Sequence, residues 1–505
     1  MRISAAWASL ATATRWPLAL VLAIQAVLTL RLIWSNTAFS DEALYLWAGR
    51  LELTHLLNGQ SVPSFASYFS GSPVLYPPLG AIAAALGGLA GARLLSLAMM
   101  LAATAMLHGI TRRLFDRRAA LFGAALFAGM AGTQYLGALA TYDAMALCLL
   151  ALATWLAVLA ASRSGPRADR LAAAAALVMA LANAAKYASG LFDPVVLGIA
   201  VLAAWHLRGR AAAIRTAAII AVSLAVLLCA GLLVAGHLYL RGLVSTTLDR
   251  HSGTYSAVWL LTLSGRWLWV VAALGALGLA AAATSGRGRV FTLLTAVMAA
   301  AIALAPAEQA RIHTYTSLFK HDDYGAWFGC AVAGYAVAAL SSVAPADKAT
   351  TAFRVGVVAA AVAFLPGIPT ASQEYGWPNS TSLLATMRAV IAAHPGPILA
   401  DDDGDLLHFY LGQQVRNLPV VGTWYISYRG PGQARPRHGM AGYADAISHR
   451  YFSVALLEFV DNVAVDGQLE RDLTADGQYR LVAHFPFRVG RASRESMIFV
   501  REDSR

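Results

Sequence analysis

The chain has 505 residues, of which 58% are hydrophobic and only 13% are charged. Soluble globular domains carry about 25% charged residues, so this composition excludes a soluble fold and indicates a membrane protein. The net charge of +11 does not indicate nucleic-acid binding, because the arginines stand in short loops between apolar runs. The cysteines, Cys148, Cys229 and Cys330, lie in apolar runs without metal-ligand spacing, so neither a disulfide nor a zinc site is expected.

Apolar runs near the length that crosses a bilayer predict about eleven transmembrane helices. They fall at residues 16–34, 92–111, 119–137, 142–161, 171–185, 187–206, 213–239, 264–283, 290–306, 324–342 and 353–369. The first run lacks a clear small-residue cleavage site, so it is interpreted as a retained helix and not as a signal peptide.

The loops between these runs predict the orientation of the chain. Every second loop is basic, and these loops contain Arg112, Arg163, Arg208, Arg287 and Arg354. Because basic loops stay on the cytoplasmic side, the N-terminus is expected in the cytoplasm, and an odd number of helices places the C-terminus outside. The sequence therefore predicts a multi-pass protein of the plasma (inner) membrane.

Two acids follow the first run, in the sequence Ser40-Asp41-Glu42, and residues 43–52 predict an amphipathic helix capped by Ser40. Two interpretations stay open. The acids complement the helix dipole, or one of them is a general base that takes a proton from an acceptor hydroxyl. Adjacent helical residues point about 100° apart, so only one acid can face a given centre, and Asp41 is the choice.

Further candidates follow along the chain on the predicted outer side. Tyr76 precedes a Pro-Pro step that begins a short helix at the membrane interface, and it is a candidate to line a cavity. Asp143 opens the run at 142–161, either as a solvated helix cap or as a functional carboxylate at membrane depth. Lys186, at the end of the run at 171–185, either extends toward the interface or joins the site.

Residues 308–324 form the densest polar cluster before the tail, with Arg311, His313, Lys320 and His321 as cations and donors. One interpretation is a solvated loop with interfacial anchors. The other is a cradle for a lipid phosphate, because cations suit phosphate oxygens. Three more residues are candidates to join this cradle, although interfacial anchoring is the more typical role; they are Arg250, His251 and Arg266.

The tail changes character near Pro369, where charges and alternating segments begin. Helices are predicted at 381–394 and 442–449, and strands at 397–400, 453–460, 480–487 and 497–501. We therefore expect a transmembrane domain over 1–370 and a small extracytoplasmic α/β domain over 371–505. The acidic run 401–405 indicates a solvated turn more than a cation loop, since it lacks spaced ligands and a terminal Glu.

Four motifs in this order resemble the GT-C superfamily of integral membrane glycosyltransferases. They are Ser40-Asp41-Glu42, Tyr76 to Leu79, Tyr142-Asp143 and Lys186-Tyr187. The resemblance covers residues 15–370 and is closest to the branch of protein O-mannosyltransferases and lipid A aminoarabinose transferases. It implies the GT-C fold, a polyprenyl-phosphate sugar as donor, a catalytic role for Asp41, and a second catalytic carboxylate at Asp143.

The resemblance also suggests where the donor phosphate binds. Some members carry Lys or His where this chain has Tyr76, which shifts the expected phosphate contacts to Lys320 and His321, with Arg311 and Lys186 in support. A divalent metal cofactor stays open, and the candidates to hold it are Asp41, Glu42 and Asp143.

The hypothesis is transfer of a sugar, with inversion at its C1, to a hydroxyl of a glycan, lipid or protein at the outer face of the membrane. A lipid or glycan transporter or flippase is the alternative, although the sequence shows neither the paired repeats nor the broken helices typical of transporters. A third possibility is a sensor or scaffold whose tail binds a ligand. The sequence identifies neither the sugar nor the acceptor.

Overall fold

The computed structural model describes residues 2–250, 252–342, 348–401, 404–460, 463–475, 477–489 and 492–502. The chain divides into two compact units. The first unit comprises Met1–Trp34 with Leu51–Tyr375, and the second comprises Ser35–Arg50 with Gly376–Arg505. Helix α2 (Ser40–Asn58) contributes residues to both units.

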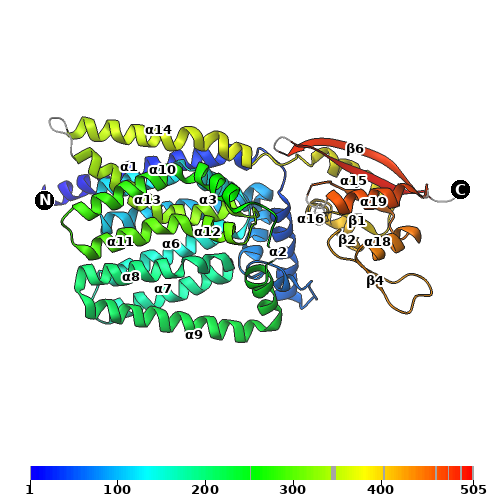
Figure 1. Ribbon diagram of the computed structural model, residues 1–505, viewed down its shortest axis with the longest axis horizontal. Helices are drawn as coiled ribbons and strands as arrows, with labels where there is room; N and C mark the ends of the chain where they lie inside the picture. The colour runs from blue at the N-terminus through cyan, green and yellow to red at the C-terminus, as the bar shows by residue number, and fades with distance from the viewer. Residues whose placement is uncertain are drawn as a thin grey trace. The chain divides into compact units, whose positions relative to one another are not determined.

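The first unit consists of helices (Figure 1). The long ones are α1 (Arg2–Ile33), α3 (Tyr76–Leu114), α4 (Arg117–Gly129), α6 (Tyr142–Ala161), α7 (Pro166–Ala185), α8 (Asp193–Arg208), α9 (Arg210–Leu243), α10 (Ala257–Thr284), α11 (Arg289–Ala300), α13 (Leu318–Ser342) and α14 (Lys348–Glu374). The short ones are η1 (Phe65–Ser67), α5 (Ala131–Ala138), η2 (Tyr187–Phe192), η3 (Val244–Leu248), η4 (Ala301–Ala303) and α12 (Leu304–Arg311).

Among the described residues, eight helices are long and apolar enough to cross a membrane, or nine if the bent pair α4–α5 counts as one crossing. Each of the eleven predicted runs lies in one helix or in consecutive helices, and the predicted polytopic membrane fold is confirmed. Two of the eleven predicted runs, 16–34 and 353–369, are not among these eight or nine helices. The first gives the shorter apolar helix Pro17–Ile33, and the last lies in α14, where many side chains are outside the described set.

At least three of the described membrane helices are interrupted, and in α9 the break lies at Gly236, with a φ of 79°. In α3 the break lies at Gly87 and Gly88, and Gly88 has a φ of 62°, a conformation that favours glycine. Helices α4 and α5 meet at Met130 with a bend of 64°. Gln134 Nε2 donates to the Gly129 carbonyl at 2.9 Å, which satisfies a backbone group that the bend releases. The bend at Met130 falls inside the predicted run 119–137, in which the sequence marks no break.

The second unit contains a five-stranded sheet in the order β2-β1-β5-β7-β6. Its strands are β1 (Ile398–Ala400), β2 (Val420–Val421), β5 (Val454–Leu457), β6 (Tyr479–Val489) and β7 (Ala492–Arg501). Strands β2, β1 and β5 are parallel, and β5, β7 and β6 are antiparallel. A separate pair consists of β3 (Ser427–Tyr428) and β4 (Arg437–His438).

Helices complete the second unit: α15 (Thr381–Ala393), α16 (Gly404–Tyr410), α17 (Gly412–Val415), α18 (Gly439–Ser448) and α19 (Val463–Ala475). Leu399, Ala455 and Phe499 stand side by side in register, and they pack with Ile447 of α18 and Leu469 of α19. The predicted strands at 397–400, 453–460, 480–487 and 497–501 match β1, β5, β6 and β7. The expected α/β character of the tail is confirmed; Asp402 and Asp403 lie outside the described residues.

The segment before and within α2 is held in this second unit by polar and ring contacts. Asn36 Nδ2 donates to the Trp377 carbonyl at 2.7 Å, and the Ala38 amide donates to the Tyr410 hydroxyl at 2.8 Å. Trp47 of α2 stacks on His408 of α16 with ring centroids 4.0 Å apart. Burial lowers the pKa of His408 from 6.5 to about 4, because the charged ring is poorly solvated there.

This shift predicts a loss of stability in mild acid. The folded state favours the neutral ring, so the contribution of His408 is complete above pH 6.5 and is lost as the pH falls toward 4. At about pH 5 the free energy of unfolding is expected to be about 2 kcal/mol lower from this group alone. Thermal unfolding of full-length protein at about pH 7.5 and pH 5 measures the loss. The variant His408→Phe should lose less than wild type; an equal loss in both would contradict the role of this ring.

Candidate active site

The candidate site begins where α6 starts and α7 ends. A short connection, residues 162–165, joins the two helices, so the first turn of α6 and the last turn of α7 come together. Asp143 lies in the first turn of α6, where the helix dipole favours a carboxylate, and Lys186 follows α7, where it favours a cation. The Lys186 ammonium lies 2.6 Å from Asp143 Oδ1, and both side chains are buried.

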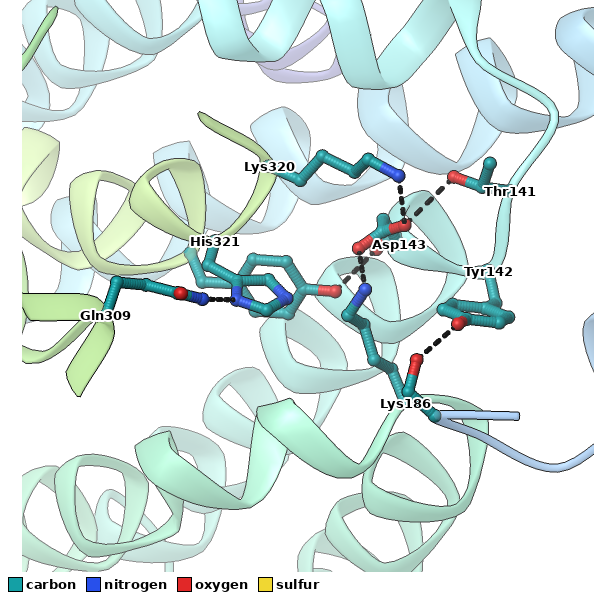
Figure 2. Close-up of polar contacts among 9 residues, drawn as sticks. Thr141, Tyr142, Asp143, Lys186, Gln309, Lys320 and His321 are labelled. Carbon is teal, nitrogen blue, oxygen red and sulfur yellow. Dashed lines mark hydrogen bonds and ion pairs between the residues drawn. The ribbon is translucent and has the colours of Figure 1, made fainter. Parts of the chain in front are cut away.

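A third helix adds a second cation. Lys320, in the first turn of α13, places its ammonium 4.0 Å from the other carboxylate oxygen of Asp143 (Figure 2). Thr141 Oγ1 donates to that same oxygen at 3.0 Å, and the Tyr324 hydroxyl donates to the Asp143 carbonyl at 3.0 Å. Asp143 therefore lies between two ammonium groups from different helices, in the interior of the first unit.

The segment before α3 fixes the position of Lys186. The Ser72 amide donates to the Ala184 carbonyl at 2.7 Å, and the Tyr187 amide donates to the Ser70 carbonyl at 2.9 Å. A Cβ on Gly71 would lie 2.1 Å from the Ala185 carbonyl oxygen, so only glycine allows this approach. The backbone on both sides of Lys186 is thus clamped, and its ammonium also lies 4.8 Å above the Tyr142 ring.

A cavity of about 270 Å³ adjoins this cluster. It is lined by Tyr187, Ala188, Leu191, Phe192, Thr246, Thr247, Arg250, Ala305, Glu308, Gln309, Ile312, His321 and Tyr324. Two of these residues link it to the cluster, because Tyr187 follows Lys186 and Tyr324 bonds the Asp143 backbone. Burial lowers the pKa of the Arg250 guanidinium below its usual range, while His321 Nδ1 lies 2.9 Å from Gln309 Nε2 (Figure 2).

The polar cluster at 308–324 is helical at both ends, with a turn at 312–317 between α12 and α13, and its end in α13 is not a solvated loop. Helix α13 begins at Leu318, before the predicted apolar run, and Lys320, Asp322 and Asp323 are buried in it. The solvated-loop interpretation is therefore wrong for these residues. Asp323, which no sequence pattern marks as functional, accepts a hydrogen bond at 3.2 Å from Thr133 Oγ1, which lies just after the bend between α4 and α5.

Other predicted phosphate ligands lie in different settings. Arg311 is exposed and pairs with Glu308 at 2.6 Å, so it reaches the cavity wall only through that carboxylate. Tyr76 is buried at the start of α3, with its hydroxyl 3.4 Å from Ser96 Oγ. His251 lies outside the described residues, and Arg266 is exposed on α10. Phosphate binding by Arg311 and Tyr76 stays a prediction.

The first acidic pair belongs to the second unit. Both acids lie in the first turn of α2, as predicted. Glu42 is fully buried, and one carboxylate oxygen accepts a hydrogen bond from the Phe39 amide at 2.9 Å, which is a capping contact. Asp41 is only partly buried. The pairing of Asp41 with Asp143 at one catalytic centre stays a prediction.

The surroundings of these acids bear on whether they hold a divalent metal ion. Among the described residues, no three His, Cys, Asp or Glu side chains gather in a group able to hold a metal ion. Asp143 lies beside two ammonium groups, whose positive charge disfavours a divalent cation on the same carboxylate. The donor set around Asp143 therefore suits an anion better than a metal.

Comparison with known proteins gives a family match over part of the chain. The family described as Dolichyl-phosphate-mannose-protein mannosyltransferase matches residues 73–240. That range contains Asp143 and Lys186, whereas Asp41 and Lys320 lie outside it. No curated protein sequence matches the chain.

Solved structures with a similar fold cover nearly the whole chain. ArnT from Cupriavidus metallidurans, bound to undecaprenyl phosphate, has 15% identity and a TM-score of 0.58, over 96% of this chain and 98% of that one. The oligosaccharyltransferase AglB from Archaeoglobus fulgidus, in complex with an inhibitory peptide and a dolichol-phosphate, has 14% identity and a TM-score of 0.56, over 93% of this chain and 73% of that one. Arabinofuranosyltransferase AftD from Mycobacteria has 16% identity and a TM-score of 0.50, over 96% of this chain and 41% of that one.

Proposed function

We propose that the chain is a GT-C membrane glycosyltransferase, as its motifs predict, and that it transfers a sugar from a polyprenyl-phosphate donor to an acceptor hydroxyl; the family match and the fold similarity support this. The observation that carries the proposal is the buried arrangement of Lys186 and Lys320 around Asp143 beside a cavity. Ammonium groups in a poorly solvated site stabilise phosphate oxygens far more than they do in water.

The proposed reaction is a single displacement at the sugar C1. Asp41 takes the proton of the acceptor hydroxyl as its oxygen forms the new bond to C1. The bond from C1 to the phosphate oxygen breaks, and its electron pair stays on polyprenyl phosphate, whose added charge is stabilised by Lys186 and Lys320. Attack from the face opposite the leaving group inverts C1.

Asp143 has a positioning role in this scheme. Its carboxylate pairs with both ammonium groups and accepts a hydrogen bond from Thr141, so it holds the two lysines close together. One negative charge cannot neutralise two positive charges, so the cluster keeps a net positive charge. The two lysines come from helices far apart in the sequence, and the carboxylate fixes their separation before the donor binds. Preorganised charge of this kind acts without reorganisation during the reaction.

The location of the reaction follows from the proposed orientation. The basic loops would lie in the cytoplasm, so the start of α6, the end of α7 and the start of α13 would face the outside of the plasma membrane. Residues 371–505 would then form the extracytoplasmic domain. A donor anchored in the membrane suits this side, where nucleotide sugars are not available, and the acceptor would be a glycan, a lipid or a protein.

Substitutions in the lysine cluster test the donor site. Lys320→Ala, and His321→Ala beside it, are expected to raise the KM for the donor by about tenfold and to leave the KM for the acceptor unchanged, because Lys320 loses an ion pair with phosphate and His321 loses a hydrogen bond to it. Kinetics with each substrate varied in turn, using full-length protein in lipid, measure the two constants. Unchanged donor KM in both variants would place the phosphate elsewhere.

Transport of a lipid or glycan is the second candidate function, and the bend of 64° between α4 and α5 favours it. Broken helices are typical of transporters, where freed backbone groups bind substrate. Here Gln134 already satisfies the Gly129 carbonyl, which favours a structural bend. Movement of a lipid-linked sugar across proteoliposomes without any transfer product would support transport.

A further inference from the structure

The segment between β2 and α18 exposes aromatic rings, which the rest of the second unit covers. Trp424 is 65% exposed and Tyr425 is 69% exposed. Among the described residues of this unit, every other Phe, Trp and Tyr side chain is buried or half-buried. Two neighbouring exposed rings in a unit that otherwise covers its aromatic side chains indicate a binding surface.

The chain alternates between the core and the surface in this segment. Ile426 belongs to the core of the second unit, and Tyr428 packs against it. Tyr425 and Arg429 alternate with them along the chain and are exposed. The Tyr425 ring also stacks on His438 of β4, with centroids 6.0 Å apart. The β3–β4 pair therefore presents aromatic rings and an arginine on its outer side.

The same segment is basic and has no acid of its own. No Asp or Glu lies between Asp405 and Asp445, whereas four arginines do: Arg416, Arg429, Arg435 and Arg437. Arg437 lies 3.8 Å from Asp445. Arg429 and Arg435 are exposed, and no carboxylate of a described residue pairs with either of them. Positive charge that the fold does not neutralise suits an anionic partner.

The loop that carries these arginines is held in place by hydrogen bonds. Arg429 Nη2 donates to the Ala434 carbonyl at 2.9 Å, and Gln433 Oε1 accepts from the Gly430 amide at 3.1 Å. Gln433 Nε2 donates to Asp445 Oδ2 of α18 at 2.7 Å, which ties the loop to a helix. Figure 1 shows the loop beside β4 projecting from the second unit. Because the loop is already ordered, binding a ligand costs it little conformational entropy.

We propose that residues 424–438, the aromatic–arginine hairpin, bind an acidic glycan, which is a chain of sugars carrying carboxylate or phosphate groups. The faces of the Trp424 and Tyr425 rings carry partial negative charge and attract the C–H groups of sugar rings. Arg429 and Arg435 pair with the acidic groups through the planar fork of the guanidinium. The proposal uses the predicted extracytoplasmic position of the tail. It goes beyond the proposed function, because it does not depend on sugar transfer.

The composition of the hairpin favours a glycan over a protein or a membrane surface. A stable protein interface buries about 800 Å² on each partner around an apolar centre, which two exposed rings on a narrow hairpin do not provide. Surfaces that bind membranes insert aliphatic side chains into the lipid. The hairpin has one large aliphatic residue, Ile426, and it is buried.

The test measures the binding of a short oligogalacturonate, which carries one carboxylate on each sugar, by isothermal titration. The protein is the full chain in nanodiscs of zwitterionic lipid. Wild type is expected to bind with an affinity that falls as the salt concentration rises. It should bind the methyl ester of the same oligosaccharide at least about tenfold more weakly, because the ester has the same sugars without their charges.

Substitutions in the hairpin separate the roles of the rings and of the charges. Trp424→Ala and Tyr425→Ala are each expected to weaken binding about tenfold, because each removes a ring that contacts the sugars. The double variant Arg429→Gln with Arg435→Gln should weaken binding by a similar factor and also reduce its dependence on salt.

A matched control lies on β6, at the edge of the sheet opposite β2. Arg480 is exposed as well, but it pairs with Glu502 at 3.1 Å. Arg480→Gln removes one positive charge from the same unit without touching the hairpin. Its affinity for the oligogalacturonate should equal that of wild type.

The outcomes decide the proposal without reference to catalysis. Absence of binding by wild type, equal binding of the acid and its methyl ester, or unchanged affinity in both Trp424→Ala and Tyr425→Ala would overturn it. Binding to vesicles that contain phosphatidylglycerol, without binding of the oligogalacturonate, would assign the hairpin to a membrane surface instead. The assay contains no sugar donor, so failure of the proposed glycosyltransferase activity would leave its result unchanged.

Discussion

Replacing Asp143 by Asn is expected to lower the free energy of unfolding by about 3–5 kcal/mol and to reduce transfer at least about 100-fold. The substitution leaves two buried ammonium groups close together without the carboxylate that lies between them. Like charges in a poorly solvated interior repel strongly, so both the fold and the geometry of the donor site suffer. Thermal unfolding and a transfer assay on the same preparation measure the two effects.

Two further variants separate stability from function. Asp169 pairs with Arg215 at 2.7 Å on an exposed surface, so Asp169→Asn is expected to leave both stability and transfer close to wild type. The double variant Asp143→Asn with Lys186→Gln removes one charge of each sign, and it should regain stability but not transfer. Recovery of transfer together with stability would mean that the cluster is structural only.

The second large effect is expected at Asp41. Asp41→Asn should reduce kcat by about 10²–10⁴-fold with little change in donor binding, because an amide cannot take the proton from the acceptor hydroxyl. Normal transfer by Asp41→Asn, in protein that folds and binds donor, would show that the base is another group.

Glu42, next to Asp41 in the sequence, provides a control for the Asp41 variant. Glu42 is fully buried and accepts a hydrogen bond from the Phe39 amide, a bond that the amide oxygen of glutamine also accepts. Glu42→Gln is therefore expected to reduce transfer by less than about tenfold. A larger loss at Glu42 than at Asp41 would reverse the assignment of the two acids.

Local patterns in the sequence predicted the elements well. Apolar length located the membrane helices, and alternation located the longer strands β5, β6 and β7. The pairing of Asp143 with Lys186 is also a local matter, because a short connection joins α6 to α7 and brings the two residues to the same end of the hairpin. Both residues are candidates from the sequence, but their pairing is not predicted there. Short elements such as β2, with two residues, carry no detectable pattern.

Long-range features could not be predicted in this way. Lys320 reaches Asp143 only because α13 packs against the helices around it, and periodicity does not encode which helices meet. The start of α13 was placed too late because Lys320, His321, Asp322 and Asp323 interrupt the apolar pattern, although they are helical. The bend at Met130 has no proline to mark it, and the partners in the cavity, Gln309 and His321, come from separate helices.

The decisive measurement is a transfer assay with full-length protein in lipid, offered a panel of polyprenyl-phosphate sugars and a membrane extract as acceptor. Wild type should release free polyprenyl phosphate and glycosylate the acceptor with at least one donor, and Asp41→Asn should release almost none. The donor that supports release also identifies the sugar. Absence of release with every donor, from wild-type protein shown to be folded, would contradict the assignment of this chain as a polyprenyl-phosphate-dependent glycosyltransferase.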